Sequence, residues 1–201
     1  GRLQPEIARP VFPDYDLELQ YRVMEAVGAR TDIPVPGLLG LEPDPSVLGV
    51  PFYIMRRVQG RIPSDIPPYN MDGWLLHETS ETQRAKLWQA AVDTMARYHR
   101  VDHQTLAVPG LAEPAAGSSA LQAQLDYWQR YHDWAFDGQR HATGQAALDW
   151  LRRNQPADEP TTLCWGDARL GNMIFTPSLD EVAAALDWEM AVLGNPVQDI
   201  A

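Results

Sequence analysis

Apolar residues recur at the spacing of an α-helix in two stretches of the first half of the chain. The first covers residues 14–27 and stops at Gly28, which predicts a helix closed by a glycine C-cap. The second begins at Ser80, three residues before Gln83, which is the spacing of a capping box. Its apolar residues stay on one face as far as Tyr98, so we expect this helix to be the spine of a larger helical region.

The pattern changes in the second half of the chain. Residues 104–119 contain Gly, Pro and Ala without periodicity, which indicates a surface loop. Helical spacing returns over residues 119–137 and 143–153, with a break near Gly138. Short apolar runs between turn residues predict β-strands over residues 38–41, 52–55, 161–165, 173–175 and 182–188.

Two polar segments organise these elements. Residues 176–181 separate the last two predicted strands and are typical of a hairpin turn. The Pro-rich residues 61–69 predict an extended connector. We therefore expect two parts, residues 1–60 with the early strands and the first helix, and residues 61–201 with the other helices and the hairpin.

Composition limits the classes of protein that the chain can represent. With 201 residues, 45% of them hydrophobic, it can bury one sizeable core. A net charge of −11 argues against nucleic acid or an anionic membrane as a partner, because both favour clustered Lys and Arg. A single Cys excludes an internal disulfide framework, and without a signal peptide or a long apolar run we expect a cytoplasmic protein.

Three polar residues accompany the predicted strands near the end of the chain. Asp167 and Asn172 are five residues apart in a loop between two strands, and Asp187 ends the strand that returns from the hairpin turn. All three should therefore converge on one edge. A carboxylate can orient an attacking hydroxyl, and carboxylate and amide oxygens are ligands that Mg²⁺ prefers. The pattern predicts a phosphoryl-transfer site.

These segments resemble the aminoglycoside phosphotransferase family, which has a protein-kinase-like fold. The resemblance is closer to its bacterial phosphotransferase-family branch and to the kinase-like domain fused to some acyl-CoA dehydrogenases. The strongest motifs are Trp165–Asn172, Leu186–Glu189 and Gly194–Ala201. Residues 51–61 resemble the strand that leads into the ATP hinge, and residues 95–99 resemble the end of the helix beneath the catalytic loop.

The resemblance implies a two-lobe α+β fold, with a partial small lobe over residues 1–60 and a mainly helical large lobe. It implies ATP and Mg²⁺ as cofactors and a small-molecule hydroxyl acceptor as partner. Asp167 would then be the catalytic residue, and magnesium would be held by Asn172 and Asp187. The backbone from Arg56 to Val58 would contact the nucleotide base.

The sequence also departs from the family pattern. No Gly-rich hairpin precedes Arg2, and chains of the resembled family carry further helices after Asp199, so we expect a chain truncated at both ends. Arg2 is either the cation that faces the phosphates or an exposed terminal residue. Its partner on the small-lobe helix would be Gln20 by register, with Glu18 two residues earlier. Trp165 stands where many kinases have His before Gly-Asp. The resemblance gives Asp199 the role of bracing the catalytic loop through backbone amides.

Other polar and aromatic residues leave alternatives open. Arg169 either neutralises transferring phosphate or pairs with a neighbouring acid. His99 and Cys164 are expected to be a satisfied core histidine and a buried, inert thiol. A stripe at helical spacing either belongs to the core or lines an acceptor site, and it consists of Tyr127, Tyr131 and Trp134.

The favoured hypothesis is an ATP- and Mg²⁺-dependent kinase of a small hydroxylated molecule. One alternative is a kinase-like nucleotide-binding or regulatory module without turnover, and another is a metal-dependent hydrolase built on Asp167 and Asp187. The acceptor, whether an aminoglycoside, a hydroxyacyl-CoA or an amino-alcohol, does not follow from the motifs, and neither does the oligomeric state.

Overall fold

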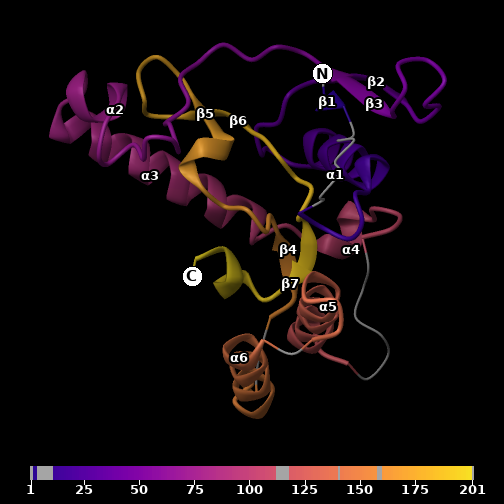
Figure 1. Ribbon diagram of the computed structural model, residues 1–201. Coiled ribbons are helices and arrows are strands. Elements are labelled where there is room, and N and C mark those ends of the chain that lie inside the picture. The colour runs from indigo at the N-terminus through magenta and orange to yellow at the C-terminus, as the bar shows by residue number, and fades with distance from the viewer. Residues whose placement is uncertain (1, 4–10, 112–117, 140, 158–159, 201) are drawn as a thin grey trace.

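The first part of the protein is a three-stranded antiparallel sheet with a helix packed on it, as the computed structural model shows (Figure 1). Strand β3 (Phe52–Met55) lies between β1 (Arg2–Leu3) and β2 (Leu38–Glu42), and α1 (Leu17–Arg30) contacts β2 and β3. The two strands predicted in this part are confirmed. The structure describes residues 2–3, 11–111, 118–139, 141–157 and 160–200.

Helix α1 begins later and ends later than its apolar pattern predicted. Asp16 caps its N-terminus, where Asp16 Oδ1 accepts a hydrogen bond from the Leu19 amide at 2.8 Å. The helix continues through Gly28 and is capped by Thr31, so the predicted glycine C-cap was wrong. Gly28 has a packing reason instead, because a Cβ there would lie 2.8 Å from Val35 Cγ2.

The long helix α3 (Glu81–Tyr98) confirms the predicted capping box. Ser80 Oγ accepts a hydrogen bond from the Gln83 amide at 3.3 Å, and Gln83 Oε1 accepts one from the Ser80 amide at 2.9 Å. Across the described ranges, no helix is both long enough and apolar enough to cross a membrane.

Two helices of a single turn flank α3, namely α2 (Trp74–His77) and α4 (His103–Leu106). The second lies where the sequence predicted the start of a loop, so that prediction was wrong at residues 104–106. Asp102 caps α4 by accepting a hydrogen bond from the Gln104 amide at 3.0 Å. Four residues are too few to show a helical period, which is why the pattern missed this element.

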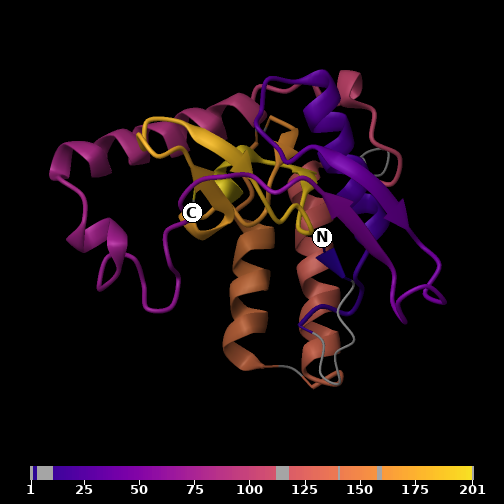
Figure 2. The ribbon, with the colours of Figure 1, turned by 90° about the horizontal axis from the view of Figure 1, so that it is seen from above.

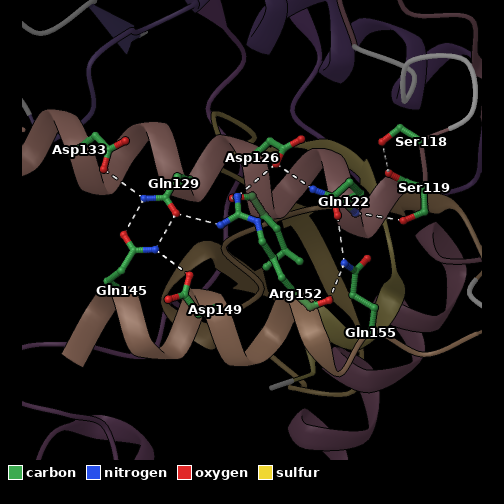
Figure 3. A network of polar contacts seen from close by, with 11 residues as sticks. Ser118, Ser119, Gln122, Asp126, Gln129, Asp133, Gln145, Asp149, Arg152 and Gln155 are labelled. Atoms are coloured by element: carbon green, nitrogen blue, oxygen red, sulfur yellow. Dashed lines mark hydrogen bonds and ion pairs between the residues drawn. The ribbon is translucent and has the colours of Figure 1, made fainter. Parts of the chain in front are cut away.

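Helices α5 (Ala120–Ala135) and α6 (Ala142–Arg153) form an antiparallel pair that projects from the rest of the chain (Figure 2). Polar side chains join the two helices (Figure 3). Arg152 donates hydrogen bonds to Gln129 Oε1 at 2.8 Å and to Asp126 Oδ1 at 3.1 Å. The polar face of α5 therefore packs against α6, and α5 also contacts β7 in the body of the protein.

The remaining strands form two small antiparallel sheets. The predicted turn over residues 176–181 is confirmed, because it connects a paired hairpin. The second strand of this hairpin is shorter than the predicted 182–188, because Asp187 has a φ of 61° and leaves the extended conformation. The pairs are β5 (Met173–Phe175) with β6 (Val182–Ala185) and β4 (Thr162–Cys164) with β7 (Val192–Gly194).

One apolar core joins the two predicted parts of the chain. Tyr53 of β3 belongs to it together with Leu87 of α3 and Phe175 of β5. Three aromatic rings of this core lie with their centroids 5.6 to 5.9 Å apart, and they are those of Tyr98, Trp165 and Trp188. Because the core crosses residue 60, the division into residues 1–60 and 61–201 stays a prediction.

Candidate active site

The β5–β6 hairpin brings two of the predicted site residues to the same end of a sheet. Met173 pairs with Ala185, and the Leu186 amide donates a hydrogen bond to the Asn172 carbonyl at 2.8 Å. Asn172, just before β5, and Asp187, just after β6, are therefore neighbours in the hairpin, although fifteen positions separate them in the sequence. This arrangement agrees with the predicted convergence on one edge.

Asp167 is in direct contact with Asn172. The Asn172 Nδ2 group donates hydrogen bonds to Asp167 Oδ2 at 2.7 Å and to the Asp167 carbonyl at 3.1 Å. Asn172 is buried in the 3₁₀ turn η1 (Leu170–Asn172), whereas the Asp167 side chain is 31% exposed. These hydrogen bonds fix the orientation of the Asn172 side-chain amide, so its Oδ1 points away from the Asp167 carboxylate.

Arg169 pairs with neighbouring acids, which was one of its two predicted roles. Its Nε donates to Asp167 Oδ2 at 2.9 Å, and its Nη1 contacts an Asp65 carboxylate oxygen. The hydrogen bond to Asp167 raises the pKa of the Arg169 guanidinium. Asp65 was not singled out from the sequence, because it lies in the Pro-rich connector, where no periodic pattern marks a contact.

Asp187 is held by contacts on both its backbone and its side chain. The Trp165 indole donates to the Leu186 carbonyl at 2.9 Å and to the Asp187 carbonyl at 3.1 Å. Gln20 of α1 donates to Asp187 Oδ1 at 3.4 Å, and the Tyr53 hydroxyl donates to Gln20 Oε1 at 3.1 Å. Trp165 stands where many kinases have His, and its indole has a structural role here, because it holds the backbone that carries Asp187.

The structure separates the two candidate partners of Arg2 on α1. Gln20 is buried at 2% exposure and faces Asp187, whereas Glu18 forms an exposed pair with Arg22 on the same helix. A contact of either residue with Arg2 stays a prediction, because the Arg2 side chain lies outside the described part of the structure. The relay from Tyr53 through Gln20 to Asp187 was not predicted, because it joins β3, α1 and the hairpin across long sequence separations.

If Asp187 holds Mg²⁺, as the sequence predicts, a Gln20→Leu variant is expected to weaken the use of the metal. The variant removes the amide that donates to Asp187 Oδ1 and orients this carboxylate, and loss of such a contact to a metal ligand lowers metal affinity by about 10–100-fold. We expect the Mg²⁺ concentration for half-maximal activity to rise about tenfold, a change of roughly 1.4 kcal/mol. Mg²⁺ titrations of the variant and the parent check this, with Glu18→Gln as the exposed control on the same helix. An unchanged Mg²⁺ requirement in Gln20→Leu would contradict the role.

Asp199 braces the segment that leads into Asp167, as the resemblance implied. Its Oδ2 accepts a hydrogen bond from the Trp165 amide and its Oδ1 one from the Gly166 amide, both at 2.8 Å. His99 Nε2 lies 2.9 Å from Asp199 Oδ2, and the Asp199 carboxylate is fully buried. Gly166 has a φ of 84°, and a Cβ there would lie 2.2 Å from the Met190 carbonyl oxygen, so only glycine fits.

The same buried region contains the single thiol. His99, Cys164 and Asp199 each offer a ligand atom within 4.8 Å of the others, but both Asp199 oxygens are engaged by backbone amides. Burial raises the pKa of the Cys164 thiol to about 11, so the thiol is neutral, as expected for an inert cysteine. Burial likewise raises the pKa of Tyr98, whose hydroxyl has no hydrogen-bond partner within the described part of the chain. We interpret His99, Cys164 and Asp199 as a structural brace rather than a metal site.

The structure describes the backbone of the residues predicted to contact the nucleotide, but it does not describe the side chain of Arg2. The Arg56 amide donates to the Gly37 carbonyl at 2.8 Å, so a base could use the Arg56 carbonyl or the half-buried Val58 segment but not that N–H group. The backbone of Arg2 pairs with Tyr53 in the sheet, and its side chain lies outside the described part of the structure. Arg2, Arg56 and Val58 therefore remain predictions.

A cavity of about 370 Å³ opens beside the candidate catalytic loop. Gly166 and Gln20 line it, each of them next to or in contact with a predicted site residue. The aromatic stripe predicted on α5 is divided, since Tyr127 lines the cavity while Tyr131 and Trp134 do not. The full lining is Phe12, Asp14, Tyr15, Asp16, Leu17, Leu19, Gln20, Gln124, Tyr127, Trp128, Gly166, Glu189, Met190, Ala191, Val192 and Gln198.

Comparison with known families tests the resemblance directly. The model of the phosphotransferase enzyme family matches residues 6–201. The chain belongs to this family. The predicted membership is confirmed, and the α+β fold is the protein-kinase-like fold of the aminoglycoside phosphotransferases.

Individual relatives in sequence and structure agree with this assignment. Acyl-CoA dehydrogenase family member 11 of Gallus gallus is 33% identical over 194 residues, which is 96% of this chain and 23% of the relative. A solved structure from Ralstonia eutropha, assigned as a candidate aminoglycoside phosphotransferase, is 30% identical with a TM-score of 0.72. The match covers 92% of this chain and 53% of that protein.

A more distant neighbour shares the fold alone. A thermostable mutant of an aminoglycoside phosphotransferase, solved in ternary complex with ADP and hygromycin B, is 17% identical with a TM-score of 0.61. The match covers 90% of this chain and 59% of that structure. The chain thus spans about a quarter of the curated relative and little more than half of the solved structures.

Proposed function

We propose that this phosphotransferase-family member is an ATP- and Mg²⁺-dependent kinase that transfers the γ-phosphate of ATP to a hydroxyl of a small molecule. The observation that carries the proposal is the contact between Asp167 and Asn172 at the end of the hairpin that also carries Asp187. A carboxylate for the acceptor hydroxyl and two oxygen donors for a hard cation are thereby next to one another.

Asp167 would accept a hydrogen bond from the acceptor hydroxyl and orient its oxygen toward the phosphate. Its 31% exposed side chain leaves room for that contact, and Asn172 with Arg169 holds the carboxylate in place. The Asn172 side-chain oxygen Oδ1 and the Asp187 carboxylate fit Mg²⁺, because both are hard oxygen donors. Both side chains are also held by hydrogen bonds to other residues. Mg²⁺, when bound, would neutralise charge on the phosphates.

The nucleotide and the acceptor would approach from different elements. The segment from Arg56 to Val58 would contact the base, and Arg2 would face the phosphates. The neighbour solved with ADP supports nucleotide use by this fold. The cavity beside Gly166 would receive the acceptor, because it is the described cavity whose lining includes the residue next to Asp167.

Mg²⁺-dependent ATP consumption by the full-length protein tests the proposal, measured over a panel of aminoglycosides, amino-alcohols and hydroxyacyl-CoA esters. We expect at least one acceptor to stimulate turnover, and Asp187→Ala to lower it by about 10²-fold or more because a metal ligand is removed. Asp180→Ala is the control, since this exposed carboxylate lies in the turn of the same hairpin.

The other outcomes separate the alternatives. Nucleotide binding without turnover for any acceptor would favour a binding or regulatory module. Hydrolysis that needs metal but no nucleotide would favour the hydrolase. Equal losses in Asp187→Ala and Asp180→Ala would show that the hairpin fold, rather than the metal ligand, had been damaged.

A further inference from the structure

A second cavity, of about 400 Å³, lies where the C-terminal ends of α1 and α3 approach α4 (Figure 1). It shares no lining residue with the cavity beside Gly166. Its lining consists of Arg30, Thr31, Asp32, Arg97, Arg100, Val101, Asp102, Thr105 and Leu106. Three arginines therefore gather around one cavity, in a protein whose net charge is −11.

Two of these arginines are held by the protein, and the third is not. Arg30 donates through Nη1 to two carbonyl oxygens of α4. Arg97 donates through Nη1 to the Asp32 carbonyl and through Nη2 to the Thr94 hydroxyl, both at 3.2 Å. The exposed Arg100 side chain makes no hydrogen bond or ion pair with any residue of the described ranges. Arg30 and Arg97 also offset the dipoles of their helix ends, whereas Arg100 lies beyond the end of α3.

The two carboxylates of the lining already have partners. Asp102 Oδ1 accepts a hydrogen bond from the Gln104 amide at 3.0 Å, and its Oδ2 accepts one from the Thr105 hydroxyl at 2.7 Å. Asp32 Oδ2 lies 3.8 Å from Arg97 Nη1, and the Asp32 side chain is 80% exposed, so it can turn toward water. The arginines therefore outweigh the carboxylates, and the local field favours an anion.

The cavity lies at the ends of the two helices that support the candidate active site. Helix α1 carries Gln20, which donates to Asp187. Helix α3 is followed by His99, which contacts Asp199, the brace of the segment that leads into the catalytic loop. A ligand held by arginines of both helices would fix these two supports relative to one another.

We propose that this cavity binds the phosphate group of a small phosphate ester, and that the bound ester regulates the candidate active site by tying α1 to α3. The planar guanidinium fork matches the oxygens of a phosphate. Val101 and Leu106 add apolar walls for a short body, and the volume lies in the range of small-ligand sites, about 300–1,000 Å³. Binding is independent of the proposed function, whereas the regulatory effect rests on it.

Calorimetric titrations of the full-length protein, at low and constant ionic strength, test the binding. Propyl phosphate supplies the charged group with a short body, butyramide the body without the charge, and inorganic phosphate the charge without the body. We expect propyl phosphate to bind at least tenfold more tightly than butyramide and about threefold more tightly than inorganic phosphate. No binding of propyl phosphate, equal binding of butyramide, or tighter binding of inorganic phosphate would overturn the ester class.

Variants connect the binding to this cavity. Arg100→Gln removes a cation of the lining, and we expect it to weaken binding of propyl phosphate about tenfold. The control Arg153→Gln, at an exposed arginine in the last turn of α6, should stay within about twofold. Asp32→Asn should tighten binding about threefold, because it removes a negative charge from the lining. Equal losses in Arg100→Gln and Arg153→Gln would reduce the effect to general charge attraction and overturn the site.

Turnover assays test the regulatory effect separately. In the parent, propyl phosphate should lower the free Mg²⁺ concentration for half-maximal turnover about threefold, because tying α1 to α3 holds Gln20 against Asp187. Arg100→Gln should lose this response and keep its activity without propyl phosphate within about twofold. Binding with no response would overturn the regulation. Binding without phosphoryl transfer to any acceptor would support the site and refute the kinase on which the regulation rests.

Discussion

Replacement of Asp167 by Asn is expected to lower kcat for acceptor phosphorylation by about 10²–10⁴-fold, the range for loss of a positioned acid–base group. The amide has nearly the shape of the carboxylate and can keep one hydrogen bond from Asn172 or Arg169. It cannot take the proton of an attacking hydroxyl. Steady-state kinetics and nucleotide titrations should therefore show a fall in kcat with nearly unchanged ATP affinity.

Asp65→Asn is the matched control for this variant. Asp65 shares Arg169 with Asp167, is similarly exposed and lies outside the catalytic loop. If the effect of Asp167→Asn came from releasing Arg169, both variants would lose activity to the same degree. We expect Asp65→Asn to stay within about threefold of the parent, as for an exposed ion pair worth at most about 1 kcal/mol. Full activity in Asp167→Asn would refute the catalytic role.

Replacement of Asp199 by Ala is expected to cost about 3–5 kcal/mol in the free energy of unfolding. The variant removes a fully buried carboxylate that accepts hydrogen bonds from the amides of Trp165 and Gly166 and contacts His99. Three polar groups, one buried on Trp165 and two partly buried on Gly166 and His99, then lose this partner, and each buried group left unsatisfied is unfavourable by about 1–3 kcal/mol. Chemical denaturation followed by tryptophan fluorescence measures the change.

The control is Asp93→Ala, at an exposed carboxylate that accepts one hydrogen bond from Gln89 within α3. We expect its stability to stay within about 0.5 kcal/mol of the parent, as for surface substitutions in general. A similar, small loss in Asp199→Ala would mean that the brace contributes little. Where Asp199→Ala folds at low temperature, its activity should also fall, because the Trp165–Gly166 backbone positions Asp167.

Local signals in the sequence were sufficient for several elements. The Ser80–Gln83 box set the start of α3, and the turn over residues 176–181 set the β5–β6 hairpin. Gly28 was wrongly predicted to end α1. A glycine is needed there because Val35 packs close to its Cα, and a contact of this kind cannot be seen in a sequence pattern. The α4 turn failed because one helical turn has no period.

For the candidate site, spacing predicted that Asp167, Asn172 and Asp187 lie close together, because all three belong to one loop and one hairpin. The partners that hold them were hidden. Asp65, Gln20 and Tyr53 reach the site from the connector, α1 and β3, and such contacts become visible only when those elements pack together.

The sequence by itself determined the family, the α+β class and the three polar residues at the hairpin, because each follows from local order along the chain. Only the tertiary structure decided which side chains hold them and which residues line the cavity beside Gly166. The cavity combines residues from the segment before α1, from α1 itself, from α5 and from the stretch after Asp187. Its lining arises from packing between distant segments, and packing is a property of the folded chain rather than of any one stretch of it.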